Sequence, residues 1–141
     1  MTDAPIRVLL ADADPLQREG WRLVLDAQPD VEVVAEAPDG VRALAVLRRV
    51  RVDVAVVDVR MPRLGGLQVV EAVATDARIR LAQQPPVTRV VLVTATDLDR
   101  FAGPGREAGA DAVLYKDAEP EALLAAVREA GAVRRVLPDP S

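Results

Sequence analysis

The chain has 141 residues, a mass of 15.1 kDa and a formal charge of −4 at pH 7, and half of its residues are hydrophobic. This length is enough for one domain with its own core, and the negative charge disfavours a general electrostatic affinity for nucleic acid. The sequence has no cysteine and no histidine, which excludes disulfides, thiol nucleophiles and imidazole metal ligands, so any metal would be held by oxygen atoms.

The N-terminal half predicts three strands and two helices in alternation. The apolar run Ile6–Ala11 predicts a strand buried on both faces, and Asp12 follows it directly. The next segment, Pro15–Ala27, has helical spacing, with Asp14 as its N-cap. Its inward stripe is expected to consist of Leu16, Leu23, Val24 and Ala27. The following elements are a strand over Val31–Ala35, a helix from Val41 to about Val50, and a strand over Val52–Val57 that leads into Asp58.

The C-terminal half continues the alternation. A third helix is expected from near Leu67 past Ala77 until Gln84-Pro85-Pro86 stops it, because proline disfavours helix at its own position and before it. The last two strands are Arg89–Thr94 and Ala112–Tyr115, and Asp117 is expected to cap a final helix over Glu119–Ala130.

The helix after Thr94 is expected to be damaged. Asp97 and Asp99 favour a helix start, because acids stabilise the positive end of the helix dipole. Gly103-Pro104-Gly105 then falls where the interior should be. An interior proline costs about 3 kcal/mol and each glycine roughly 1 kcal/mol relative to alanine. We therefore predict that this fourth helix is short, broken or displaced.

Together these elements predict a doubly wound α/β domain with a five-stranded parallel sheet. Residues 1–132 would form the domain. Residues 133–141, which include two prolines and show no periodicity, would form the start of a linker or a disordered tail. No apolar run approaches the roughly 18–20 residues of a membrane span, and the N-terminus lacks a signal pattern, which favours a soluble cytoplasmic protein.

Four residues that can do chemistry lie where predicted strands end: Asp12, Asp58, Thr94 and Lys116. In open parallel sheets, ligands bind outside the carboxyl ends of the strands, so these side chains should converge. Two carboxylates, a hydroxyl and an ammonium suit a phosphoryl group and a divalent cation better than an organic substrate.

These residues lie in segments that resemble the receiver domains of two-component response regulators, in the branch with a LuxR-type (NarL-type) helix-turn-helix. The specific combination is Asp58-Val59-Arg60-Met61-Pro62 after an apolar strand, with Lys116-Asp117 at a later strand end. The similar stretches are Ile6–Gly20, Val31–Gly40, Val52–Pro62, Val91–Asp99 and Ala108–Val127.

The resemblance implies a flavodoxin-like sheet of order 2-1-3-4-5 and a phosphoryl-accepting switch rather than a free-standing enzyme. Asp58 would be the phosphoacceptor, assisted by Thr94 and Lys116. Mg²⁺ would be held by Asp12, Asp58 and the backbone carbonyl of Arg60. The implied partner is a sensor histidine kinase, with DNA contacted only through an output domain outside this sequence.

The sequence departs from the family pattern at the second acid of the pair after the first strand, where Ala13 stands. Losing one carboxylate should weaken Mg²⁺ binding. Asp14 is a better candidate for a helix cap than for a replacement ligand. The family usually has an aromatic residue three positions before the lysine, where this sequence has Val113; Tyr115 lies two residues later. We therefore do not expect the movements of Thr94 and of an aromatic side chain to be coupled in the way that is usual in the family.

Two further functions compete with the phosphorylatable receiver. A pseudo-receiver of the same fold would act by protein contact or small-ligand binding without phosphorylation. A free-standing enzyme is the weakest alternative, because the sequence offers no cofactor fingerprint and no second acid–base pair. We expect either a homodimer that forms through the first and last helices or no stable dimer.

Overall fold

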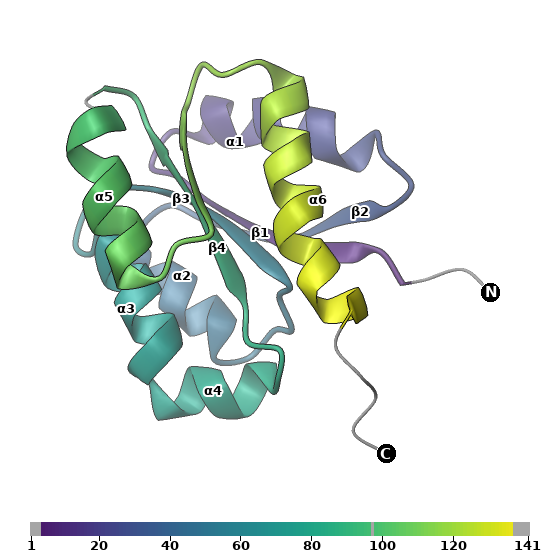
Figure 1. Cartoon of the computed structure of the whole chain (residues 1–141), viewed down its shortest axis with the longest axis vertical. Helices are drawn as coiled ribbons and strands as arrows, with labels where there is room; N and C mark the ends of the chain where they lie inside the picture. Colours follow the sequence, from purple (N-terminus) through teal and green to yellow (C-terminus); the bar gives the residue numbers. More distant parts are fainter. Residues whose placement is uncertain (1–3, 97, 137–141) are drawn as a thin grey trace.

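The structure, a computed structural model, describes residues 4–96 and 98–136 and has three layers, with a parallel sheet between two layers of helices (Figure 1). The sheet order is β2-β1-β3-β4-β5, and every pairing is parallel. This confirms the predicted doubly wound, flavodoxin-like sheet. The strands are β1 (Ile6–Ala11), β2 (Val31–Ala37), β3 (Val54–Asp58), β4 (Arg89–Thr94) and β5 (Ala112–Tyr115).

Successive strand residues pack on opposite faces of the sheet, which gives two separate hydrophobic cores. In β1, Leu9 and Ala11 contribute to one core, whereas Val8 and Leu10 contribute to the other. The second core is covered by α1 (Pro15–Asp26) and α6 (Pro120–Val136). The first is covered by α2 (Gly40–Leu47), α3 (Gly66–Thr75), α4 (Ala77–Gln83) and α5 (Leu98–Ala108).

The predicted inward stripe of α1 is wrong for Leu16, Leu23 and Ala27, which are exposed, whereas Val24 is half-buried. Leu16 is 74% exposed and Leu23 is 69% exposed, whereas Trp21 and Leu25 are buried. Trp21 and Leu25 are four residues apart and therefore share one helix face. Burying the indole removes more apolar surface from water than burying a leucine, which favours the observed rotation of the helix.

Several boundaries differ from the predictions by a few residues. β2 continues to Ala37, α2 ends at Leu47 and β3 begins at Val54. The last helix begins at Pro120, with backbone amides bonded to the Glu119 carbonyl, so Asp117 is not its cap. This helix continues to Val136, so residues 133–136 are helical although the sequence predicted a tail there. Residues 137–141 and Asp97 lie outside the described residues, and the domain boundary at residue 132 stays a prediction.

The single helix predicted from Leu67 past Ala77 is in fact two helices that meet at Asp76. The Asp76 side chain accepts hydrogen bonds from the amides of Arg78 (2.9 Å) and Ile79 (3.0 Å), which caps α4. It also pairs with the Arg48 guanidinium at 2.6 Å. This aspartate therefore ends α3 and starts α4, because its side chain satisfies amides that open a new helix.

A buried glutamine holds α4 against the sheet. The Gln83 side chain is fully buried, and its amide nitrogen donates to the carbonyls of Leu47 and Val50, both at 2.7 Å. Its oxygen accepts from the Val52 amide at 2.8 Å. Three backbone groups around the α2–β3 turn thus find their partners on α4. Hydropathy patterns do not reveal this anchor, because a glutamine at a helix end is usually solvated.

The predicted break in the helix after β4 is also wrong. α5 runs without interruption over 11 residues, with Pro104 inside it. Its C-terminus is closed by two bonds, from Gly109 N to Arg106 O and from Ala110 N to Gly105 O, with Gly109 at φ 115°. This pattern satisfies the last carbonyls, and glycine adopts the required left-handed conformation without strain. The well-formed end and the packing of Gly105 under Leu92 and Val113 offset the cost of the proline.

We expect the two glycines of α5 to respond differently to alanine. Apart from its chain neighbours and its own helix backbone, a Cβ on Gly103 would meet no atom within 4 Å. Gly103→Ala should therefore stabilise the protein through helix propensity, by less than about 1 kcal/mol because the ring of Pro104 crowds the Cβ of the residue before it. A Cβ on Gly105 would lie 3.0 Å from side-chain atoms of Leu92 and Val113, so the matched Gly105→Ala should gain less or lose stability. Urea unfolding measures both, and equal gains would contradict this account of Gly105.

Candidate phosphorylation site

Three of the four predicted site residues meet at the carboxyl edge of the sheet. The Lys116 ammonium lies 2.6 Å from Asp12 Oδ2 and 2.7 Å from Asp58 Oδ2. Asp12 is 1% exposed and Asp58 is 6% exposed, so the ammonium bridges two buried carboxylates. The predicted convergence of these side chains is therefore present.

The strand order explains why these residues meet. Ala11 at the end of β1 pairs with Val57 in β3, which places Asp12, the residue after β1, beside Asp58, the last residue of β3. Lys116 follows β5, which is separated from β3 by β4, and its amide donates to the Thr94 carbonyl at 2.9 Å. A four-carbon side chain spans this intervening strand, which a shorter basic residue would not do.

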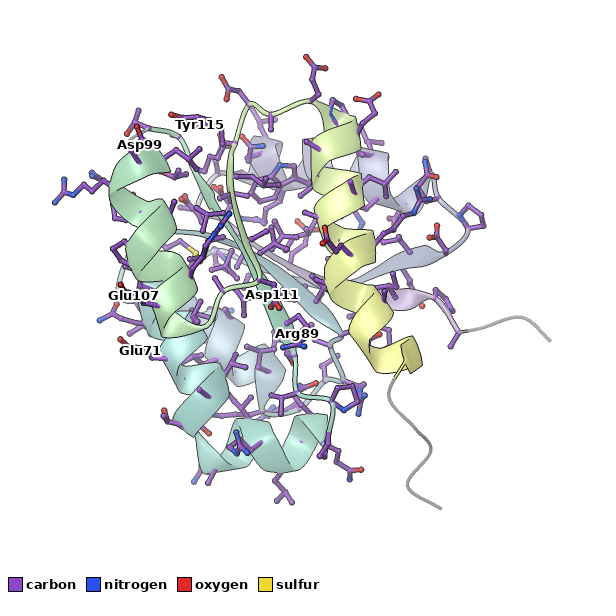
Figure 2. The ribbon with its side chains drawn as sticks, in the orientation of Figure 1. Glu71, Arg89, Asp99, Glu107, Asp111 and Tyr115 are labelled. Carbon is purple, nitrogen blue, oxygen red and sulfur yellow. The ribbon has the colours of Figure 1, made fainter. Side chains whose placement is uncertain are left out.

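Thr94 lies at the same edge, but its hydroxyl is engaged elsewhere. The side chain is buried, and its Oγ1 donates a hydrogen bond to the Thr96 carbonyl. Tyr115, which pairs with Thr94 across the sheet, is 42% exposed. Figure 2 shows Tyr115 at the same end of the molecule as Asp99 of α5. The threonine thus lies at the end of β4, the strand next to β3, with its hydroxyl bonded to the backbone of the following loop.

The pKa values of the cluster reflect two carboxylates that share one ammonium. Burial raises the pKa of Asp58 above its usual range, and the hydrogen bonds from Lys116 and the Arg60 amide only partly oppose this. Burial lowers the pKa of Lys116, but Asp12 and Asp58 outweigh it and raise that pKa overall. The pKa of Asp58 is thus raised mainly by burial, whereas the pKa of Lys116 is raised by its two carboxylate partners.

Backbone amides fix the other oxygen of each carboxylate. Asp12 Oδ1 accepts from the Asp14 amide at 2.8 Å, and Asp58 Oδ1 accepts from the Arg60 amide at 3.1 Å. The Asp14 side chain accepts from the Leu16 amide at 2.9 Å, which confirms its predicted role as the cap of α1. Asp14 is thus occupied as a cap, the role that the sequence favours over that of a replacement ligand.

The donor set suits a hard divalent cation. Asp12 Oδ2 is buried and accepts no well-aligned hydrogen bond; its close contact is the ammonium of Lys116. Mg²⁺ is commonly held by one or two carboxylates together with carbonyls and waters, and Asp12 and Asp58 are the two carboxylates that could hold it here. Within residues 4–96 and 98–136, no group of three or more acidic residues gathers around a common point, consistent with the loss of an acid at Ala13.

Two features of the site were not predicted from the sequence. A Cβ on Gly66 would lie 2.6 Å from the carbonyl oxygen of Asp58, so the start of α3 can pack on the end of β3 only with glycine there. The Arg60 and Arg100 guanidinium groups each lie 5.6 Å from the ring centre of Phe101, which links the loop after Asp58 to α5. The Gly65-Gly66 pair in the sequence could have indicated the close packing of Gly66 on Asp58. No local pattern indicates the contacts of Arg60 and Arg100 with Phe101.

Comparison with known proteins decides the family. The model of the response regulator receiver domain matches residues 8–128. The chain belongs to this family. The receiver domain is 40% identical to the transcriptional regulatory protein YxjL of Bacillus subtilis over 92% of the chain, and 36% identical to the nitrate/nitrite response regulator NarP of Escherichia coli over 88%.

A solved structure supports the same assignment. The signal receiver domain of the response regulator NarL from Mycobacterium tuberculosis shares 34% identity and a TM-score of 0.76 with this receiver domain, and the match covers 89% of this chain and 98% of that one. The predicted NarL-type resemblance is thus confirmed. The match covers 56% of YxjL and 54% of NarP, so the chain spans about half the length of these curated relatives.

A receiver domain is a signalling domain rather than a classical enzyme. In the described part of this chain, no helix is both long and apolar enough to cross a membrane.

Proposed function

We propose that this receiver domain is phosphorylated on Asp58 and relays a two-component signal. The observation that supports this most is the buried Asp58 carboxylate held 2.7 Å from the Lys116 ammonium at the end of β3. A carboxylate oxygen of Asp58 forms a bond to phosphorus while the bond from phosphorus to the donor breaks, and the donor group leaves with that electron pair. The product is an acyl phosphate.

The chain's own groups would neutralise the charge that gathers during this transfer. Lys116 would contact one phosphoryl oxygen and Thr94 would donate its hydroxyl to another after leaving the Thr96 carbonyl. Mg²⁺, held by Asp12, Asp58 and the Arg60 carbonyl, would screen the remaining negative charge between the carboxylate and the phosphoryl group.

The test is incubation of the purified chain with phosphoramidate and Mg²⁺, followed by intact mass measurement. We expect a gain of one PO₃ group, removed by hydroxylamine and mapped to the peptide that contains Asp58. Chelation of Mg²⁺ with EDTA should slow its formation strongly. The absence of an adduct at high Mg²⁺ would contradict the proposal and would support a pseudo-receiver that acts without phosphorylation. The Asp58–Lys116 pair, which such a protein would not need, favours the phosphorylated receiver.

Ala13→Asp should strengthen Mg²⁺ binding by about tenfold or more, because it adds a carboxylate beside Asp12. Ala13 is exposed, so the longer side chain meets no packing barrier. Isothermal titration with MgCl₂ measures the affinity, and Ala13→Asn is the matched control of similar shape without the charge. An affinity equal to that of the wild type would contradict our account of the metal ligands.

The partners follow from family membership and are proposed on that basis. A sensor histidine kinase would donate the phosphoryl group to this receiver in the cytoplasm. An output domain beyond the receiver would bind DNA, as the names of YxjL and NarP indicate transcriptional and response regulation. A homodimer would use α1 and α6, and the exposed Leu16 and Leu23 of α1 offer apolar surface for it. The receiver itself would occupy residues 1–132.

A further inference from the structure

An arginine of α1 reaches back to the turn that carries Asp12. Arg18 Nη1 donates a hydrogen bond to the Asp12 carbonyl, and Arg18 Nε donates to Glu36 Oε1 of β2 at 3.0 Å. The Arg18 side chain is only 16% exposed, so water competes little for these two bonds. The guanidinium therefore joins α1, β2 and the residue after β1, at the edge of the sheet where the candidate phosphorylation site lies.

The carbonyl of Asp12 and its carboxylate are coupled through the turn that follows β1. Because a peptide unit is planar, the peptide that carries the Asp12 carbonyl also sets the direction in which the chain continues through Ala13 to Asp14. The Asp14 amide donates to Asp12 Oδ1 at 2.8 Å, and Asp12 Oδ2 faces the Lys116 ammonium. A peptide that turned away from Arg18 would move this amide, and the carboxylate would lose its orientation.

The bond from Arg18 also satisfies a buried acceptor. Asp12 is buried, and its amide already donates to the Ala37 carbonyl of β2 at 3.0 Å. A buried carbonyl that loses its donor is unfavourable, so without Arg18 the turn would shift to bring this carbonyl to water or to another donor. The guanidinium thus stabilises the particular turn in which the Asp12 carboxylate points at Lys116.

The neighbouring arginine of the same helix provides a comparison. Arg22 ion-pairs with the other oxygen of Glu36, and its Nε lies 3.2 Å from Asp26. Among the described residues, these two carboxylates are its ion-pair partners, and it does not contact Asp12. The two arginines therefore share a helix, a charge and a partner, and Arg18 alone of the two holds the turn after β1.

We propose that Arg18 is a positioning residue for Mg²⁺, which orients the Asp12 carboxylate by holding the Asp12 carbonyl. This rests on the proposed function, in which Asp12 is one of the metal ligands. With Ala13 in place of a second acid, fewer carboxylates hold the ion, so the orientation of Asp12 matters more. The planar guanidinium serves two acceptors at a fixed angle, which a flexible ammonium does not. Loss of such an outer partner commonly lowers metal affinity about 10–100-fold.

The test is a titration of the folded proteins with MgCl₂ at constant ionic strength and without a phosphodonor, followed by the amide resonances of Asp12 and Ala13. Arg18→Met should raise the Kd for Mg²⁺ at least about tenfold. Removal of a positive charge near a cation site would by itself lower this Kd, so the direction of the change separates positioning from charge. Arg22→Met makes the same change in net charge and should stay within about twofold of the wild type. A Kd for Arg18→Met at or below that of the wild type would overturn the proposal, and so would an equal rise in Arg22→Met.

Arg18→Lys separates the shape of the side chain from its charge. It should raise the Kd for Mg²⁺ at least about threefold, because one ammonium replaces the two fixed donors. This variant decides alone if Arg18→Met does not fold, and a wild-type Kd in Arg18→Lys would overturn the proposal. With phosphoramidate, the Mg²⁺ concentration that gives half the maximal rate should rise in Arg18→Met, while the rate at saturating Mg²⁺ stays within about twofold of the wild type.

The outcomes for the wild type keep this inference distinct from the proposed function. A wild type that binds Mg²⁺ but forms no phosphoryl adduct would contradict the proposed function, and the comparison of Mg²⁺ affinities would still decide the role of Arg18. An adduct in the wild type together with equal Mg²⁺ affinity in Arg18→Met would overturn the role of Arg18 alone. Absence of Mg²⁺ binding by the wild type would overturn both.

Discussion

Asp58→Asn is expected to abolish the phosphoryl adduct completely while leaving the fold intact. The carboxamide occupies nearly the same space but lacks the anionic oxygen that attacks phosphorus. The matched control is Asp117→Asn, which removes an exposed carboxylate from the segment next to Lys116 and should keep the adduct. Intact mass after reaction with phosphoramidate measures both, and an adduct of unchanged yield on the Asp58→Asn variant would assign the phosphoacceptor to another residue.

The same substitution should also increase stability at neutral pH. Burial raises the pKa of Asp58 in the folded protein above the ordinary value of 3.8, so the folded state holds this proton more tightly than the unfolded state. Stability therefore falls as the pH rises from 3.8 through the folded pKa, and the deficit remains at every pH above that pKa. The carboxamide of the variant has no such titration. Urea unfolding at several pH values should show the gain of Asp58→Asn growing over this window and vanishing below it.

The cluster shows what strand topology allows a sequence to predict. Asp12 and Asp58 follow apolar runs of adjacent parallel strands, so their meeting depends only on strand order and on the alternation of side chains. Lys116 follows the same rule at longer range. Because these positions depend on the ends of buried strands, errors of a few residues in helix boundaries did not affect them.

The features that the sequence did not predict depend on tertiary contacts between helices and the sheet. Pro104 lowers local helix propensity, yet α5 continues because Gly105 packs under Leu92 and Val113 and the Gly109 cap closes its end. The division at Asp76 depends on side-chain capping and on the distant Gln83 anchor. The rotation of α1 depends on the size of Trp21, which outweighs a stripe of smaller apolar residues. The local sequence pattern of a helix does not show which distant residues the helix will contact.

Lys116→Met is expected to destabilise the protein by about 3 kcal/mol at pH 7, because it leaves two buried carboxylates side by side without a positive charge. The methionine side chain keeps most of the apolar stem, so the loss reflects charge rather than packing. Arg128→Met is the control for removal of a cation from an exposed pair with Asp30, and should change the unfolding free energy little. Urea unfolding measures both variants.

The pH dependence separates this charge effect from a packing defect. The raised pKa of Lys116 means that its contribution is fully present below its ordinary value of 10.5 and is lost only as the pH rises through the folded pKa. On the acid side, the defect of Lys116→Met should shrink as Asp58, whose pKa is already raised, takes up a proton and needs no counter-charge. Phosphorylation by phosphoramidate should slow about 100-fold, since one donor to the phosphoryl oxygens is lost. A defect of constant size across the acid and neutral range would assign the lysine to packing instead.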